Sequence, residues 1–126
     1  MVIARYPELE RLMRNLRQYW LAMVLMLTGM APAGQRPATV AVAIQLFHFD
    51  PDTLEVPVGT SVTWTNGDDI EHTVTGGDGE HADGRFEGSL AAKGTAFSFT
   101  FERPGEYSYF CDRHHFMRGI VRVTQP

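Results

Sequence analysis

The sequence predicts an all-β fold: a β-sandwich with Greek-key connections and about seven or eight strands. Three observations lead to this prediction. From Ala38 onward apolar residues alternate with polar or small ones, turn residues separate the alternating runs, and no stretch keeps the 3.6-residue period of a helix. At 126 residues, the chain is long enough for one domain with a real core and too short for two sizeable ones.

The alternating runs carry apolar side chains at every second position, as half-buried antiparallel strands do. In chain order they are 40–46, 54–58, 62–65, 70–74, 97–102, 107–111 and 121–123. The first run therefore places Leu46 on the inward face with Ile44. Residues 76–84 form the most loop-like interior segment, and a short helical turn near Ser89 to Ala92 is an alternative for the region that follows.

Residues 1–33 have the features of a secretory signal peptide. Arginines precede an apolar run from Tyr19 to Met30, which is shorter than the ~20 residues that span a bilayer. Small residues at Ala31 and Ala33 stand at the −3 and −1 positions of a cleavage site before Gly34. An uncleaved anchor is the alternative, and a start at Met13 would give a more ordinary signal. We expect a mature domain of residues 34–126, periplasmic or otherwise exported, with no permanent membrane span.

The charge distribution and the cysteine count exclude several classes of function. Residues 1–33 carry four basic and two acidic side chains, whereas the remainder carries seven basic and thirteen acidic ones. An acidic body repels phosphate, so we expect no nucleic-acid partner. The single cysteine, Cys111, excludes an intrachain disulfide. A free thiol in an oxidising compartment calls for an explanation such as metal ligation.

A cluster of soft donors lies near the C-terminus. Cys111, His114 and Met117 follow the spacing C-x2-H-x2-M, which allows all three to surround one point. A thiolate, an imidazole and a thioether together suit copper. His72, on the inward parity of the 70–74 run, would supply a second imidazole. By itself such a histidine is more often a hydrogen-bonded core residue, but with the other three it completes the donor set of a blue-copper site.

The remaining histidines offer weaker alternatives. His115 could replace His114, but it would change the spacing to C-x3-H-x1-M. His48 lies near a strand end and His81 lies in the loop-like segment, so we expect structural or surface roles for both. Zinc could bind one cysteine and two histidines, but Met117 would then have no role.

Four stretches of the chain carry a further signal: Val58-Gly59-Thr60-Ser61-Val62-Thr63-Trp64-Thr65-Asn66, Ile70-Glu71-His72-Thr73-Val74, Gly105-Glu106-Tyr107-Ser108-Tyr109-Phe110-Cys111 and the turn through Gly119. In these stretches the chain resembles the small cupredoxins of the plastocyanin, pseudoazurin and amicyanin group, roughly over residues 44–124. The ligand turn is most similar to that of amicyanin. That resemblance implies a cupredoxin-like copper-binding domain.

Two departures from the family pattern concern the surroundings of the ligands. Arg113 and His115 stand where amicyanin-like turns usually have prolines, so this turn can sample more conformations. Thr73 stands where asparagine is often found. Its backbone N–H can still donate to the thiolate, but a side-chain link between the ligand loops becomes an open question.

The function that we expect is one-electron transfer by one type 1 copper per chain, cycling between Cu(I) and Cu(II). Further copper centres would need histidine clusters that the sequence lacks, so we do not expect an enzyme. The resemblance implies that His114 exposes its ring edge beside Phe116. Arg113, His115 and Arg118 would add positive charge there, which favours a redox protein partner with an acidic rim. We expect a monomer. An exported copper carrier or storage protein is the alternative function.

Overall fold

The computed structural model describes residues 8–13, 15–16 and 37–125. The chain divides into two units, residues 1–36 and 37–126. In the first unit the described residues are helical. The predicted signal peptide falls largely outside the described residues and remains a prediction. Among the described helical residues, none forms a helix that is long and apolar enough to cross a bilayer.

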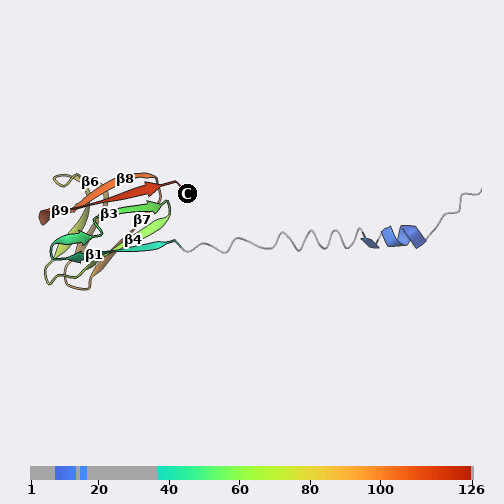
Figure 1. Cartoon of the computed structure of the whole chain (residues 1–126), viewed down its shortest axis with the longest axis horizontal. Helices are drawn as coiled ribbons and strands as arrows, with labels where there is room; N and C mark the ends of the chain where they lie inside the picture. Colours follow the sequence, from blue (N-terminus) through green and yellow to red (C-terminus); the bar gives the residue numbers. More distant parts are fainter. Residues whose placement is uncertain (1–7, 14, 17–36, 126) are drawn as a thin grey trace, which may run out of the picture. The chain divides into compact units, whose positions relative to one another are not determined.

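The second unit is a two-sheet β-sandwich, which confirms the predicted fold class (Figure 1). One sheet has the order β2 (His48–Asp50), β1 (Thr39–Gln45), β4 (Thr60–Asn66) and β7 (Ala96–Phe101). The other has the order β3 (Thr53–Pro57), β9 (His114–Thr124), β8 (Gly105–Cys111), β5 (His72–Gly77) and β6 (Ala82–Leu90). The strands β1 and β4 run parallel, as do β3 and β9, and the other pairs are antiparallel.

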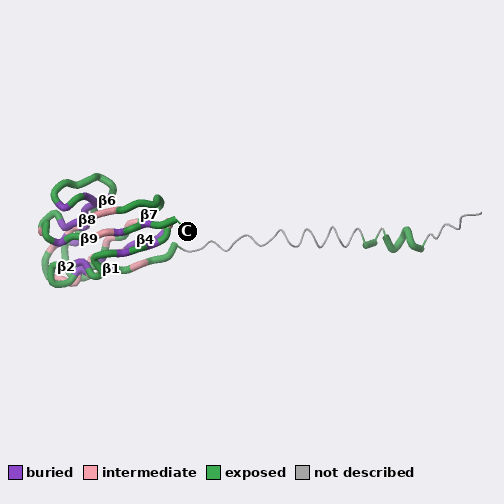
Figure 2. The backbone as a smooth tube through the Cα atoms, turned by 45° about the horizontal axis from the view of Figure 1, so that its top comes forward, coloured by how far each residue is buried: buried purple, intermediate pink, exposed green. Residues whose placement is uncertain are grey.

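The core lies between the two sheets and follows the predicted alternation. In β4 the side chains of Val62 and Trp64 are fully buried, while Ser61, Thr63 and Thr65 between and beside them are not. Buried stretches lie along the strands of the sandwich, and the connecting loops are mainly exposed (Figure 2). The Trp64 ring packs perpendicular to Tyr109 of the opposite sheet, with ring centroids 5.3 Å apart. Large aromatic side chains therefore join the layers and fix the sheets against each other.

The described residues contain nine strands, more than the seven or eight predicted. The additional long strand is β6, which includes Ser89 and Leu90 and so replaces the suggested helical turn. Its apolar alternation is interrupted at Gly88, between the buried Phe86 and Leu90. A Cβ at Gly88 would lie 2.2 Å from Cγ of Phe97, so the ring of Phe97 occupies this inward position. The predicted 76–84 loop is correspondingly shorter, because β5 and β6 extend into it.

The inward placement of Leu46 is wrong. β1 ends at Gln45, and Leu46 and Phe47 then form a turn into β2 with φ angles of 50° and 63°. Both angles lie in the left-handed region, which reverses the chain and points the Leu46 side chain outward, where it is 80% exposed. Alternation alone could not reveal this change of direction.

Candidate metal centre

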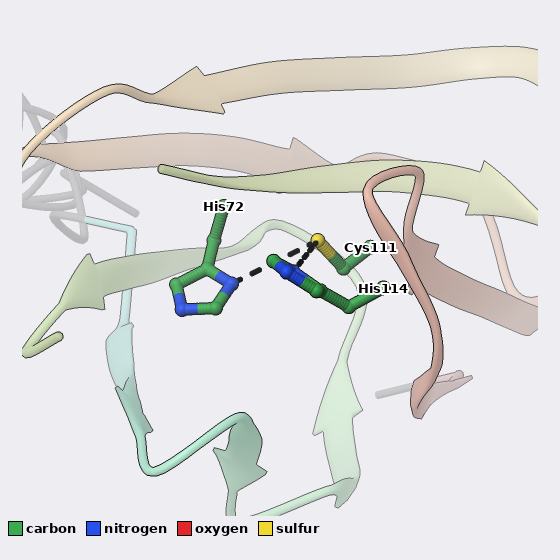
Figure 3. Close-up of side chains that lie close together, drawn as sticks. All are labelled: His72, Cys111 and His114. Carbon is green, nitrogen blue, oxygen red and sulfur yellow. Dashed lines mark hydrogen bonds between the residues drawn. The ribbon is translucent and has the colours of Figure 1, made fainter. Parts of the chain in front are cut away.

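The ends of neighbouring strands bring three of the predicted donors together. His72 is the first residue of β5, Cys111 is the last residue of β8, and His114 is the first residue of β9. β8 lies between β5 and β9 in the same sheet. The β8–β9 hairpin closes tightly, with Cys111 opposite His114 after a register shift. All three side chains therefore converge at one end of the sheet (Figure 3).

The donor atoms of these side chains surround a common point. The Cys111 Sγ lies 3.8 Å from Nδ1 of His72 and 3.6 Å from Nδ1 of His114. One donor atom from each residue lies within 4.8 Å of the other two. His72 and Cys111 are fully buried and His114 is partly exposed. A thiolate and two imidazoles at this spacing fit copper, which accepts soft sulfur and nitrogen donors.

Met117 lies on the same strand as His114, three residues further on. Its side chain is only 2% exposed and belongs to the same buried cluster as Cys111. The thioether thus faces the interior on the Cys111 side of the sheet and not the solvent.

Thr73 connects the two ligand-bearing segments around the sulfur. Its backbone N–H donates to Sγ of Cys111 at 3.3 Å. Its hydroxyl oxygen accepts a hydrogen bond from the backbone N–H of Asp112 at 2.7 Å, and it lies 3.9 Å from the same sulfur. The sequence left open whether a side chain links the two ligand loops. The Thr73 side chain makes this link. Hydrogen bonds to a ligand sulfur tune the metal that it binds.

Asp68 supports His72 from the other side of the imidazole. Its Oδ2 lies 2.9 Å from Nε2 of His72, which leaves Nδ1 toward the Cys111 sulfur. Partial burial opposes ionisation of Asp68, but hydrogen bonds from the backbone N–H groups of Phe47 and Leu46, and then from His72, hold its pKa below the ordinary value. Asp68 could not be identified from the sequence. Its only signal is a carboxylate four residues before His72, between the alternating runs 62–65 and 70–74.

Phe47 is the second residue that sequence reasoning missed. Its ring lies perpendicular to the rings of His72 and His114, at centroid distances of 5.6 and 5.1 Å. The Phe116 ring lies beyond it, 6.3 Å from Phe47, and is 69% exposed. The turn that the alternation pattern could not detect therefore places an aromatic ring directly against both imidazoles.

The other histidines lie outside the donor cluster. The structure describes one group of at least three close histidine, cysteine or acidic donors within residues 37–125, and it comprises His72, Cys111 and His114. His115 is exposed, with Nε2 3.8 Å from the Asp112 carboxylate. His48 pairs with the Leu46 carbonyl, and the exposed His81 lies beside Asp78.

The basic residues around the site are less available than their sequence positions suggest. Arg113 forms an ion pair with Glu71 at 2.8 Å. Arg118 is exposed and donates to the backbone carbonyls of His115 and Asp78. The pairing of Arg113 offsets part of the positive charge that the sequence predicts at this end of the molecule.

Comparison with known proteins identifies the family. Residues 37–124 match the copper-binding proteins of the plastocyanin/azurin family. Amicyanin of Paracoccus versutus is 34% identical over 84 residues, which are 67% of this chain and 64% of that protein, slightly less than two thirds of its length. Amicyanin-alpha of Methylorubrum extorquens is 33% identical over 93 residues, 74% of this chain and 75% of that protein.

Solved structures agree with this relationship. A purple cupredoxin from Nitrosopumilus maritimus superimposes with a TM-score of 0.61 at 32% identity, over 69% of this chain and 99% of that one. An amicyanin variant in the Cu(I) state gives a TM-score of 0.62 at 33% identity, over 69% of this chain and 83% of that one. The strand arrangement, the buried donor cluster and these matches lead to one conclusion: the chain belongs to the plastocyanin/azurin family of copper-binding proteins.

Proposed function

We propose that this protein is a type 1 copper protein that carries single electrons between redox partners, with His72, Cys111, His114 and Met117 as its ligands. One observation carries the proposal: two imidazole nitrogens and one thiol sulfur lie within 4.8 Å of one another in a largely buried position. Bound copper supplies the chemistry, which is the exchange of one electron between Cu(I) and Cu(II).

The residues around the donors favour electron transfer because they hold the donors in place. Asp68 orients His72, and the backbone N–H of Thr73 stabilises negative charge on the Cys111 sulfur. The buried Met117 would add a weak thioether donor, which would tune the bound copper. Donors fixed at strand ends need to move little when the metal changes its charge, so each electron transfer involves little reorganisation.

His114 provides the route for the electron to the surface. It is the partly exposed member of the donor cluster, and the exposed Phe116 ring lies 6.1 Å from it. A small apolar contact of this kind suits a short-lived redox encounter with a partner protein. Arg113, His115 and Arg118 would border that contact. Because Arg113 is paired with Glu71, we expect a modest dependence of the rate on salt, carried mainly by Arg118.

Addition of Cu(II) to the purified domain tests the ligand assignment. We expect an intense blue or purple colour in a one-to-one complex. Cys111→Ser should abolish the colour, while Met117→Leu should retain copper with an altered reduction potential. His115→Asn is the matched control and should leave the spectrum unchanged. A colourless protein that preferred Zn(II), or loss of the site in His115→Asn, would contradict the assignment.

A second measurement tests the role as an electron carrier. The copper-loaded protein is oxidised and reduced repeatedly in the presence of a Cu(I) chelator. An electron carrier keeps its copper through these cycles. Transfer of copper to the chelator upon reduction would instead support a copper carrier or storage protein.

We propose further that residues 1–33 direct export and that the mature domain works in the periplasm or in another exported compartment. This proposal rests on the order of charged, apolar and small residues in the leader. The mass of the protein recovered from the exported fraction should correspond to a chain that begins at Gly34. A chain that kept its leader and remained with the membrane would support the anchor alternative.

A further inference from the structure

The turn between β1 and β2 adopts a conformation that its sequence does not favour. Leu46 and Phe47 both have left-handed φ angles, 50° and 63°, which bulky side chains rarely adopt. Neither residue is glycine, asparagine or aspartate, so the conformation must be imposed by contacts from elsewhere.

The contact that imposes the conformation comes from one carboxylate. Asp68 accepts hydrogen bonds from the backbone N–H of Leu46 at 2.8 Å and from that of Phe47 at 3.1 Å. The same carboxylate lies 2.9 Å from Nε2 of His72. Asp68 itself is held by Asn66, whose side-chain oxygen accepts from the Asp68 N–H at 2.9 Å. We call this arrangement of Asp68 with Leu46, Phe47 and His72 the Asp68 clasp.

The clasp holds the backbone from which the Phe47 ring extends. The ring stands perpendicular to both imidazoles and is 39% exposed, so one side faces the histidines and another faces solvent. His72 beneath it is fully buried, although it is at the end of its strand. Phe116, by contrast, is 69% exposed and has a ring contact with His114 but none with His72 in the described structure.

We propose that Asp68 is a positioning residue that uses the Asp68 clasp to hold the Phe47 ring over the imidazoles and so seals the metal centre against water and small solutes. This inference deepens the proposed function, because a sealed centre favours electron transfer and excludes external ligands. It concerns this chain's own residues, and the metal-free protein can therefore test it.

The primary experiment measures alkylation of the Cys111 thiol by iodoacetamide in the folded, metal-free protein. Cys111 is the only cysteine and is fully buried between the two histidines. In the wild type iodoacetamide reaches the buried thiol only when the structure around it opens locally. Phe47→Ala should raise the alkylation rate about tenfold, because without the ring the reagent no longer needs that opening. Asp68→Ala should raise it to a similar level. The double variant should react no faster than Phe47→Ala, since both changes remove the same seal.

Two controls separate sealing from general destabilisation. Leu46→Ala removes a large side chain from the same turn but leaves its backbone N–H in place, so the alkylation rate should not change. Val62→Ala creates a cavity beside β4, within the core and away from the β1–β2 turn, and lowers overall stability. Measured without denaturant, it should raise the alkylation rate much less than Phe47→Ala does. If Asp68→Ala cannot be obtained folded, Asp68→Asn keeps the shape but cannot accept from all three donors, and it replaces that variant.

Each outcome decides the inference. Unchanged alkylation in Phe47→Ala overturns the seal. Rapid alkylation in Phe47→Ala with wild-type behaviour in both Asp68 variants overturns the role of Asp68. If the increase in alkylation rate in the double variant equals the product of the increases in the two single variants, the two substitutions act independently. That result overturns the clasp.

A metal-loaded measurement extends the test and remains distinct from it. Azide added to the Cu(II) protein should leave the wild-type electron paramagnetic resonance spectrum unchanged and should alter that of Phe47→Ala and Asp68→Ala. Azide binding to the wild type would overturn the seal. If the wild type took up no copper at all, the proposed function would fail, whereas the alkylation rates would still decide the inference.

Discussion

Thr73→Val is a sharp test of how the ligand loops are joined. Valine has nearly the shape of threonine and leaves the backbone N–H of residue 73 free to donate to the Cys111 sulfur. It removes the hydroxyl that accepts from the Asp112 N–H at 2.7 Å. Because one intramolecular hydrogen bond contributes about 1 kcal/mol net, the free energy of unfolding of the metal-free protein should fall by about 1 kcal/mol.

Thr73→Val should also lower the reduction potential of the copper-loaded protein. The Thr73 hydroxyl lies 3.9 Å from the Cys111 sulfur, toward which it donates, and its oxygen lies 3.2 Å from the Thr75 hydroxyl oxygen. A donor at the sulfur withdraws charge that would otherwise stabilise Cu(II), so its loss favours the oxidised state. A difference of ~1 kcal/mol or less corresponds to at most ~40 mV, since 59 mV is tenfold for one electron.

Urea unfolding and voltammetry of Thr73→Val and Thr73→Ser check both effects. Serine keeps the hydroxyl and should retain most of the stability and the potential. A loss in Thr73→Ser with none in Thr73→Val would show that the methyl group, and not the hydroxyl, matters. No change in Thr73→Val would refute the role of the link altogether.

Three further predictions follow from the same structure. Gly88→Ala forces a methyl group against the Phe97 ring and should lower the free energy of unfolding by about 1–3 kcal/mol, measured by urea unfolding; wild-type stability would contradict the assigned packing. Leu46→Gly relieves a left-handed φ at an exposed position and should raise the melting temperature through ~1 kcal/mol of added stability, whereas a decrease would mean that the turn is unstrained. The lowered pKa of Asp68 means that its ionised form stabilises the fold above the ordinary value of 3.8 and that this contribution is lost as the pH falls through the folded value. Asp68→Asn should therefore weaken the acid dependence of metal-free stability, and an unchanged pH profile would contradict this linkage.

The sequence predicted the sandwich because its strands are half-buried, and such strands show themselves by alternation. Val62 and Trp64 are clear examples, since both face the core and polar residues flank them. The prediction missed β6 because Gly88 carries no side chain and leaves the inward position to Phe97, a residue of another strand. Tertiary contacts of this kind have no local signal.

The candidate site likewise contains residues with a local sequence signal and residues without one. Cys111, His114 and Met117 were recognisable because their spacing is local, and His72 became recognisable once a metal required a further donor. Asp68 and Phe47 were missed because their roles depend on a turn whose direction changes at Leu46. Asp68 falls between the alternating runs 62–65 and 70–74, and this position in the sequence does not predict what its carboxylate binds.

The parallel pairing of β3 with β9 has a consequence for the order of folding. The pairing joins Thr53 to Ile120, so the five-stranded sheet cannot be completed until nearly the whole domain is available. His72 and Cys111 are likewise 39 residues apart in the chain. Contacts between such distant segments form late and slowly. A chain that emerges from its N-terminus onward would therefore bring His72, Cys111, His114 and Met117 together only after its last strand has emerged.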